Sequence, residues 1–352
     1  MKKLSSIFSF KNLPYTLIVV IVVVFASQQL LTRSTAYWTY LYKNSNPKFD
    51  DGLRFAAVAN GIDKNKKKAL IMGASQAREN VDIGALNNSF SNEDITFYNL
   101  GISQGQAVDF FMTKNLVMNT NPDLIIFVGD LNMISSPYMF TKLRLYFHPS
   151  IIYQWIEILG WRYLWEHKKE TLHAFLGYIF PVYQFRESFG RILQNELAIN
   201  ILNKKRKPFK RFAYSGMRRK TIYEDLDNTL QSDKTDDIAS PEEIAMNEAL
   251  FERFIEGITD RGIPFIMIDA PYYKNAKETY FGEIYPGYDK YINSLSKRYN
   301  FSYYSDADTP IFDKEDFVDH THLNAAGRRK FTTFLTEIAD ELFFDSHNNI
   351  QD

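Results

Sequence analysis

The stretch Ala69-Leu-Ile-Met-Gly-Ala-Ser-Gln-Ala-Arg-Glu-Asn80 decides the fold. It opens with a short apolar run, a pattern typical of a strand that is covered on both faces. Gly73 permits a sharp turn after the strand, and the chain is then expected to continue as a helix. Ser75 would therefore lie where a strand turns into a helix, at the edge where open α/β sheets place their sites.

Outward from this stretch, short apolar runs alternate with helical patterns. The other candidate strands are residues 95–98, 124–128, 265–268 and 301–304. Helices are predicted over 105–118, 240–262 and 324–343, and the second opens with Ser240-Pro-Glu-Glu243, a capping box with proline at the first helical position. The alternation predicts an α/β domain with a parallel five-stranded sheet covered by helices on both sides.

Residues that suit acyl transfer follow the predicted strands. A serine hydroxyl is a weak nucleophile unless a base takes its proton, and a histidine held by a carboxylate can do so at neutral pH. Asp319 and His322 are three residues apart near the C-terminus, so one turn can present both. The backbone N–H groups of Ser75 and Gly101 could hold the oxyanion that forms when Ser75 attacks an ester.

In chain order, these motifs resemble the SGNH (GDSL-type) hydrolase superfamily: Gly73-Ala-Ser75, Asn99-Leu-Gly101, Gly129-Asp-Leu-Asn132 and Asp319-His-Thr-His322. The resemblance covers roughly residues 68–132 and 262–343. It implies a flavodoxin-like three-layer sandwich, with Ser75 as nucleophile, His322 as base and Asp319 as the orienting acid. It also implies Gly101 as an oxyanion donor. No cofactor and no metal are expected.

Two motifs depart from the family pattern. The first has alanine where the family has the aspartate of Gly-Asp-Ser. The third normally reads Gly-x-Asn-Asp, and here Leu131 takes the place of the asparagine that serves the oxyanion hole. Asn132 lies one position after the place of the asparagine in the family pattern. It is either an oxyanion donor or a loop residue. Arg78 and Asp130 are further candidates for contacts with substrate.

The departure in the third motif is familiar in membrane-anchored SGNH-like proteins that modify envelope polysaccharides. The chain is similar to those related to alginate O-acetylation and to teichoic-acid D-alanyl transfer. This similarity implies an acylated glycan or another envelope ester as substrate, and a membrane acyltransferase as partner.

The N-terminus predicts export and attachment to a membrane. Lys2, Lys3 and Lys11 precede the apolar run 17–26, and about 20 mainly apolar residues can span a bilayer. Lysines before such a segment place the N-terminus in the cytoplasm and the following domain outside. An aromatic cluster at 37–42 favours a retained anchor over a signal peptide cleaved after Ala26, because Tyr and Trp prefer the headgroup level.

These features divide the chain into four parts: a cytoplasmic tail and membrane anchor (1–34), a membrane-proximal linker (35–66), the α/β domain (67–345) and a C-terminal tail (346–352). Residues 136–235 break the alternation and are predicted to form a helical insertion. An aromatic stripe at 153–185 and a basic run at 204–220 suggest that the insertion is a lid or a docking element.

Composition excludes several classes of function. The chain has no cysteine, which removes disulfides, thiolate nucleophiles and cysteine-bound zinc. Its formal net charge of -1 gives no case for nucleic acid as a partner.

We therefore predict an exported, membrane-anchored serine O-acyl esterase or acyltransferase that acts on envelope glycans. Two alternatives stay open. A non-catalytic binding or scaffold subunit would keep the fold and lack a complete oxyanion hole, as Leu131 suggests. A metal-dependent hydrolase would use Asp319, His320 and His322 as ligands.

Overall fold

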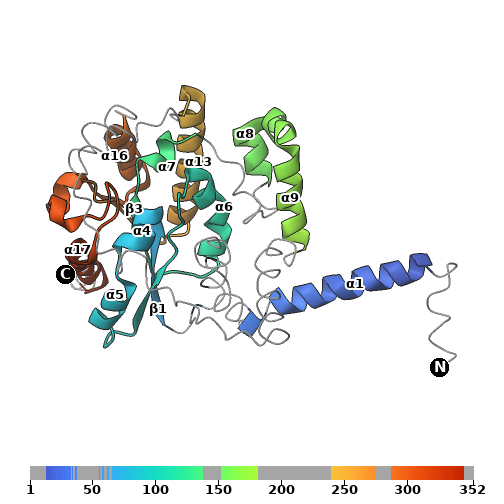
Figure 1. The fold of residues 1–352 in the computed structure, drawn as a ribbon, viewed down its shortest axis with the longest axis horizontal. Coiled ribbons are helices and arrows are strands. Elements are labelled where there is room, and N and C mark those ends of the chain that lie inside the picture. Colours follow the sequence, from blue (N-terminus) through green and yellow to red (C-terminus); the bar gives the residue numbers. More distant parts are fainter. Residues whose placement is uncertain are drawn as a thin grey trace, which may run out of the picture.

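The computed structural model describes residues 13–32, 66–137, 152–180, 239–273 and 287–344, with single residues between 34 and 62. Five strands form one sheet in the order β2-β1-β3-β4-β5, and all neighbouring strands are parallel. They are β1 (Lys67–Gly73), β2 (Ile95–Asn99), β3 (Leu124–Gly129), β4 (Phe265–Asp269) and β5 (Ser302–Tyr304). The predicted parallel sheet is confirmed, and its strand order is the flavodoxin-like one (Figure 1).

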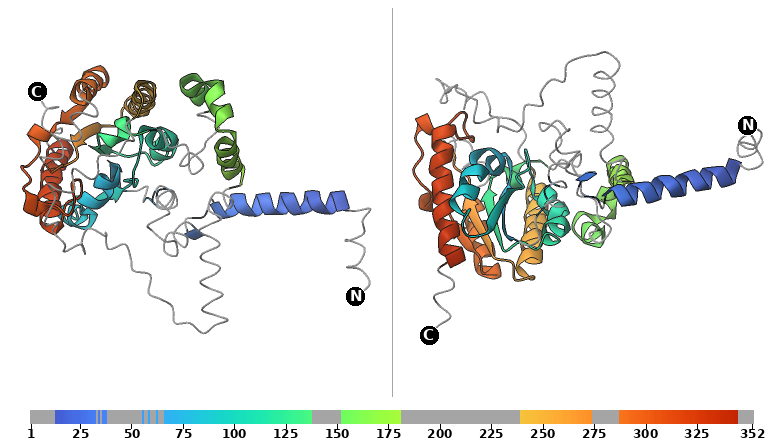
Figure 2. Two further views of the ribbon diagram at one scale, coloured as in Figure 1. Left: turned by 45° about the horizontal axis from the view of Figure 1, so that its top comes forward. Right: turned by 90° about the horizontal axis from the view of Figure 1, so that it is seen from below.

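Helices cover both faces of the sheet (Figure 2). One face carries α4 (Ser75–Asn80), α5 (Ile83–Ser89) and α17 (Ala325–Phe344), which pack together. The other carries α6 (Ala107–Met118) and α13 (Pro241–Thr259), and α16 (Tyr288–Tyr299) packs against α13 and β5. Because both faces are covered, β3 is buried at every position, which explains why the strands read as uninterrupted apolar runs.

Phenylalanine side chains fill the layer between β3 and the helices α6 and α13. The ring of Phe127 on β3 lies 4.8 Å from that of Phe110 and 5.2 Å from that of Phe251. Aromatic pairs at these separations add to the stabilisation from burial. The capping box predicted at Ser240 forms, with its side chain accepting from Glu243 N–H, and it begins α13 as expected. This packing fixes the carboxyl end of β3, where the third motif follows.

Part of the predicted insertion is helical. It contains α8 (Ile152–Glu166) and α9 (Lys168–Ile179), and α8 packs against both α9 and α13. The basic run 204–220 lies outside the described residues, as do the C-terminal tail and most of the linker 35–66.

The N-terminal helix α1 (Leu13–Thr32) runs away from the sheet (Figure 1). Its apolar side chains from Leu17 to Phe25 are exposed. Among the described residues, no helix combines the length and the apolar character needed to cross a membrane. The predicted transmembrane anchor is therefore not confirmed and stays a prediction.

Candidate active site

The nucleophile candidate lies at the junction between β1 and α4. Gly73 ends β1 with a φ of +135°, and a Cβ at this position would lie 2.2 Å from the carbonyl oxygen of Val128. Only glycine fits this backbone and this close approach. The turn allows α4 to begin at Ser75, which places the hydroxyl at the carboxyl edge of the sheet as predicted.

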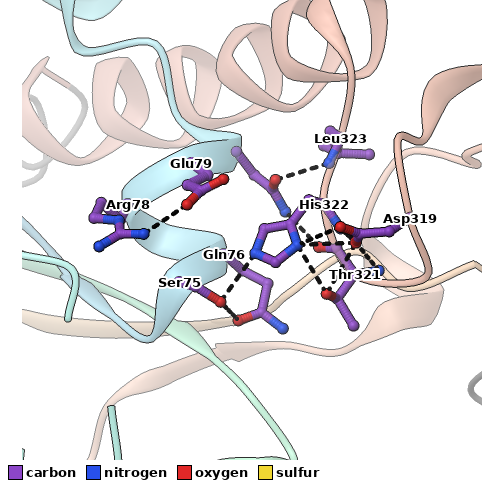
Figure 3. Close-up of polar contacts among 9 residues, drawn as sticks. Ser75, Gln76, Arg78, Glu79, Asp319, Thr321, His322 and Leu323 are labelled. Carbon is purple, nitrogen blue, oxygen red and sulfur yellow. Dashed lines mark hydrogen bonds and ion pairs between the residues drawn. The ribbon is translucent and has the colours of Figure 1, made fainter. Parts of the chain in front are cut away.

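Ser75, His322 and Asp319 form one hydrogen-bonded chain (Figure 3). The Nε2 atom of His322 lies 3.0 Å from Ser75 Oγ, across 247 residues of sequence. On the other side of the ring, Nδ1 lies 2.8 Å from Asp319 Oδ1 and 3.0 Å from Oδ2. The predicted nucleophile, base and acid therefore come together in the arrangement that activates a serine hydroxyl.

Within the hydrogen-bonded chain of Ser75, His322 and Asp319, the electrostatic interactions favour an ionised Asp319 that holds His322 as the base. Burial opposes ionisation of Asp319, but the hydrogen bond and charge of His322, together with backbone N–H donors, lower its pKa to about 2. Burial opposes protonation of His322, yet the hydrogen bond and charge of Asp319 raise the pKa of the imidazole above its usual value. Each partner thus stabilises the charged form of the other.

Asn80 joins the helix of the nucleophile to the loop of the histidine. Its side chain is fully buried. Its Nδ2 donates to the carbonyl oxygen of Thr321 at 3.0 Å, and its Oδ1 accepts from Leu323 N–H at 2.8 Å. One carboxamide therefore holds the backbone on both sides of His322, at the opposite end of α4 from Ser75.

The predicted oxyanion donor Gly101 lies against α4, but its amide already has an acceptor. A Cβ at this position would come within 2.5 Å of Arg78 N, so the loop after β2 approaches the helix of the nucleophile closely. The N–H of Gly101 donates to Asn99 Oδ1 at 2.9 Å. Asn99 in turn donates through Nδ2 to the carbonyl oxygen of Ala77 at 2.8 Å.

The third motif forms a buried turn after β3. Asn132 is the first residue of the short helix α7 (Asn132–Ser135), and its N–H donates to Asp130 Oδ1 at 2.8 Å. The side chain of Asn132 has no hydrogen bond to another described residue. Asp130 is buried and also accepts from the hydroxyl of Tyr272 at 2.5 Å. Burial raises the pKa of Asp130, although these hydrogen bonds act against the increase.

Gln76 follows the nucleophile directly and contacts it with its side chain. Its side chain is 1% exposed, and its Oε1 lies 3.5 Å from Ser75 Oγ. The carboxamide also acts to lower the pKa of Asp130, against the larger effect of burial. Gln76 therefore places a buried carboxamide next to the nucleophile.

Arg78 extends away from the triad and forms an ion pair with Glu79 at 2.6 Å (Figure 3). No observation places it against a substrate, so its predicted role stays a prediction. His320 accepts a backbone hydrogen bond from Tyr273 through its carbonyl oxygen. Among the described residues, no group of three histidines and carboxylates is arranged to hold a metal ion, so the metal-hydrolase alternative gains no support.

Comparison with known protein families gives no matching family model. Comparison with curated proteins gives no match either. The assignment of chemistry to this site therefore depends on its own geometry.

Sequence reasoning missed the contributions of Gln76, Asn80, Asn99 and Tyr272. Gln76 and Asn80 belong to the stretch that decides the fold. Polar residues that follow a buried strand so closely could have been taken as a sign of a role in the site. Tyr272 lies three residues after the end of β4, at the same edge of the sheet as the other site residues. Their partners, however, could not be read from local patterns.

Proposed function

We propose that the protein is a serine O-acyl esterase or acyltransferase that works through an acyl-enzyme. The observation that carries this proposal is the hydrogen-bonded chain from Ser75 Oγ through His322 to Asp319. Its order and its distances are those required for a serine nucleophile, a general base and an orienting carboxylate. The resemblance of the motifs to SGNH hydrolases supports the same class of reaction.

In the first step, Ser75 Oγ forms a bond to the carbonyl carbon of an ester while His322 Nε2 takes the hydroxyl proton. The carbonyl electron pair moves to oxygen. When it returns, the bond to the leaving alcohol breaks, and His322 gives its proton to that alcohol. Water or a second hydroxyl then repeats the sequence and receives the acyl group, which restores Ser75.

The substrate class and the location belong to the same proposal. Similarity to proteins of envelope polysaccharide modification favours an acylated envelope glycan, and a membrane acyltransferase as partner. Attachment through α1 is supported by its exposed apolar side chains, because apolar surface in water costs about 25 cal/mol per Å². Lysines before this helix favour an exported domain.

The decisive experiment is covalent labelling of the full chain with a fluorophosphonate, a reagent that reacts with activated serines. We expect the wild type to label and Ser75→Ala to remain unlabelled. Ser294→Ala is a matched control, because this serine is exposed on α16 and should not affect labelling. Failure of the wild type to label, or equal labelling of Ser75→Ala, would remove the nucleophile from the proposal.

A second candidate function is binding without catalysis. It is favoured by Leu131 at the position of the missing asparagine and by the hydrogen bond that already occupies the Gly101 amide. A scaffold subunit would bind an acetylated glycan equally well in the wild type and in Ser75→Ala, and neither protein would release acetate. Release of acetate by the wild type alone would exclude this alternative.

A further inference from the structure

Outside α1, the exposed apolar side chains gather on α8 and α9. Among the residues that the structure describes, five large apolar side chains outside α1 are exposed, and four of them belong to this pair of helices. They are Trp161 and Trp165 on α8 and Leu172 and Phe175 on α9, whereas Ile311 is the fifth. Single exposed apolar residues are normal on a soluble protein, but a group of them marks a contact surface. We call these four residues the α8–α9 face.

The spacing of the four residues lets each helix present one apolar strip. Trp161 and Trp165, which are 72% and 73% exposed, are four residues apart and follow the break of α8 at Gly160. Leu172 and Phe175 are three residues apart on α9. Residues three or four apart lie on the same face of a helix. The two strips therefore turn apolar surface outward, while α8 also packs against α13.

The α8–α9 face adjoins the apolar surface of α1. Phe180 directly follows α9, and its ring lies 6.3 Å from that of Phe25 on α1 in an edge-to-face contact. Figures 1 and 2 show α9 beside the end of α1 that is nearer the sheet, with α17 on the opposite side of the molecule. Phe25 itself belongs to the exposed apolar run of α1. The two apolar surfaces therefore meet the same surroundings.

The side chains at this face suit a layer of lipid headgroups. Tryptophan combines an apolar ring with one polar N–H and prefers the headgroup level of a bilayer. Arg162, Lys168 and Lys169 are exposed beside the face, with Lys168 Nζ 5.5 Å from the ring centre of Trp165 and Arg162 paired with Glu166. Lysine is depleted in protein interfaces, whereas interfacial helices combine tryptophan and leucine with cations that attract anionic lipid.

We propose that the α8–α9 face contacts the surface of an anionic lipid bilayer at the level of the headgroups. The inference goes beyond acyl transfer and adds a second contact to the proposed attachment through α1. A single small lipid contact is reversible, and stable attachment takes two such signals. In this arrangement α1 holds the domain at the membrane, and the α8–α9 face fixes which side of the domain meets the lipid.

The absence of cysteine from the chain allows a single labelled position to be engineered. Leu172→Cys carries a nitrobenzoxadiazole fluorophore on the α8–α9 face, and Thr333→Cys carries it on the exposed surface of α17. Each full chain is reconstituted into vesicles of phosphatidylcholine and phosphatidylglycerol, with or without bromine on the acyl chains near the headgroup. Bromine quenches a fluorophore that touches lipid. We expect quenching for Leu172→Cys and none for Thr333→Cys.

A second comparison tests whether the tryptophans hold this face against lipid. In the labelled Leu172→Cys chain, Trp161→Ala combined with Trp165→Ala should reduce the quenching. Ile311→Ala is the matched control, because Ile311 is exposed but lies outside α8 and α9, and it should leave the quenching unchanged. All these positions are exposed, so the substitutions should not disturb folding.

The outcomes separate this inference from the acyl-transfer proposal. Equal quenching at the two labelled positions, or no quenching in vesicles that carry the full chain, would overturn the inference, as would unchanged quenching in the double tryptophan variant. A shift of emission to shorter wavelength without quenching would mean that a second copy of the chain covers the face, which also refutes lipid contact. Fluorophosphonate labelling of the same vesicles reports on Ser75 independently, so either proposal can fail without the other.

Discussion

His322 is the residue on which the proposed chemistry depends most, because its two ring nitrogens have different partners. The hydrogen bond from Nδ1 to Asp319 leaves Nε2 as the acceptor that faces Ser75. Since the pKa of Asp319 is lowered to about 2, this carboxylate stays ionised over the whole range in which the imidazole titrates. The acid limb of the pH profile should therefore report His322 and not Asp319.

We expect the rate of fluorophosphonate labelling to rise with pH through the pKa of His322. A protonated imidazole cannot take the Ser75 proton, and Asp319 raises the pKa of His322 above the usual value of about 6.5. Asp319→Asn removes the charge that causes this increase. The midpoint of the acid limb should move to lower pH and the plateau rate should fall, by roughly 10⁴-fold if the tautomer is lost.

The measurement is the labelling rate between pH 5 and 9 for both proteins, a range set by the usual histidine pKa of about 6.5. Ionic strength is held constant, because charge interactions depend on it. A midpoint that stays in place, or moves to higher pH, in Asp319→Asn would contradict the assignment of Asp319 as the partner of the base.

Asn80 offers a test of positioning. Asn80→Ala removes both hydrogen bonds that hold the loop of His322, which should cost about 1 to 3 kcal/mol of unfolding free energy. Asn87 makes the same kind of double contact with the backbone of Phe97, at 3.1 and 2.7 Å. Asn87→Ala is therefore a matched control.

Denaturant unfolding should show both asparagine variants to be destabilised, whereas labelling should slow only in Asn80→Ala. Equal labelling rates in the two variants, measured under conditions where both are folded, would mean that the contacts of Asn80 serve stability alone.

At this scale, sequence analysis predicted Ser75, Asp319 and His322 because their residue types and local spacing suit one reaction. It could not predict the roles of Gln76 and Asn80. The role of a side-chain amide depends on its hydrogen-bond partners, and the sequence does not show which residues these are. The partners of Asn80 lie more than 240 residues away along the chain. Only the packing of α4 against the loop before α17 brings them within hydrogen-bond distance.

The junction between β1 and α4 is the element that aims the nucleophile. β1 pairs with both β2 and β3, so its end is held on two sides before the chain turns into α4. The strands themselves were predictable, because a strand covered on both faces needs apolar residues at successive positions. The helix α16 was not predicted, because only Tyr288, Ile292 and Leu295 are buried along it.

Gly73→Ala should disrupt this junction. The new Cβ would meet the carbonyl oxygen of Val128 at 2.2 Å and Ala77 Cβ at 2.9 Å, and the φ of +135° is strained for alanine. We expect a loss of roughly 3 kcal/mol or more of unfolding free energy, together with loss of labelling. Gly262→Ala is the control, because Gly262 also has positive φ but open space around it, so only about 1 kcal/mol should be lost.

Chemical denaturation of both glycine variants measures the difference. Equal destabilisation would mean that backbone strain alone matters at Gly73 and that the close approach of β3 does not.

For the whole molecule, the parallel sheet explains how distant motifs meet. Parallel strands present their carboxyl ends at one edge, and the loops after β1, β2, β3 and β4 therefore converge there. The helix α17 closes this edge from the far end of the chain, with His322 just before it. Sequence analysis predicted the sheet from its alternation, but it could not show that Asn99 occupies the Gly101 amide.

The last prediction concerns the relation of α1 to this assembly. The buried core of the described residues includes no side chain from α1, so the α/β domain should fold without it. We expect the full chain to sediment with membranes and to resist a high-salt wash, because contact through apolar surface is not screened by salt. A chain that lacks residues 1–34 should be soluble and should label with fluorophosphonate at the rate of the full chain. Full-length protein in the soluble fraction would refute attachment through α1, whereas a shortened chain that unfolds would show that the domain needs this helix.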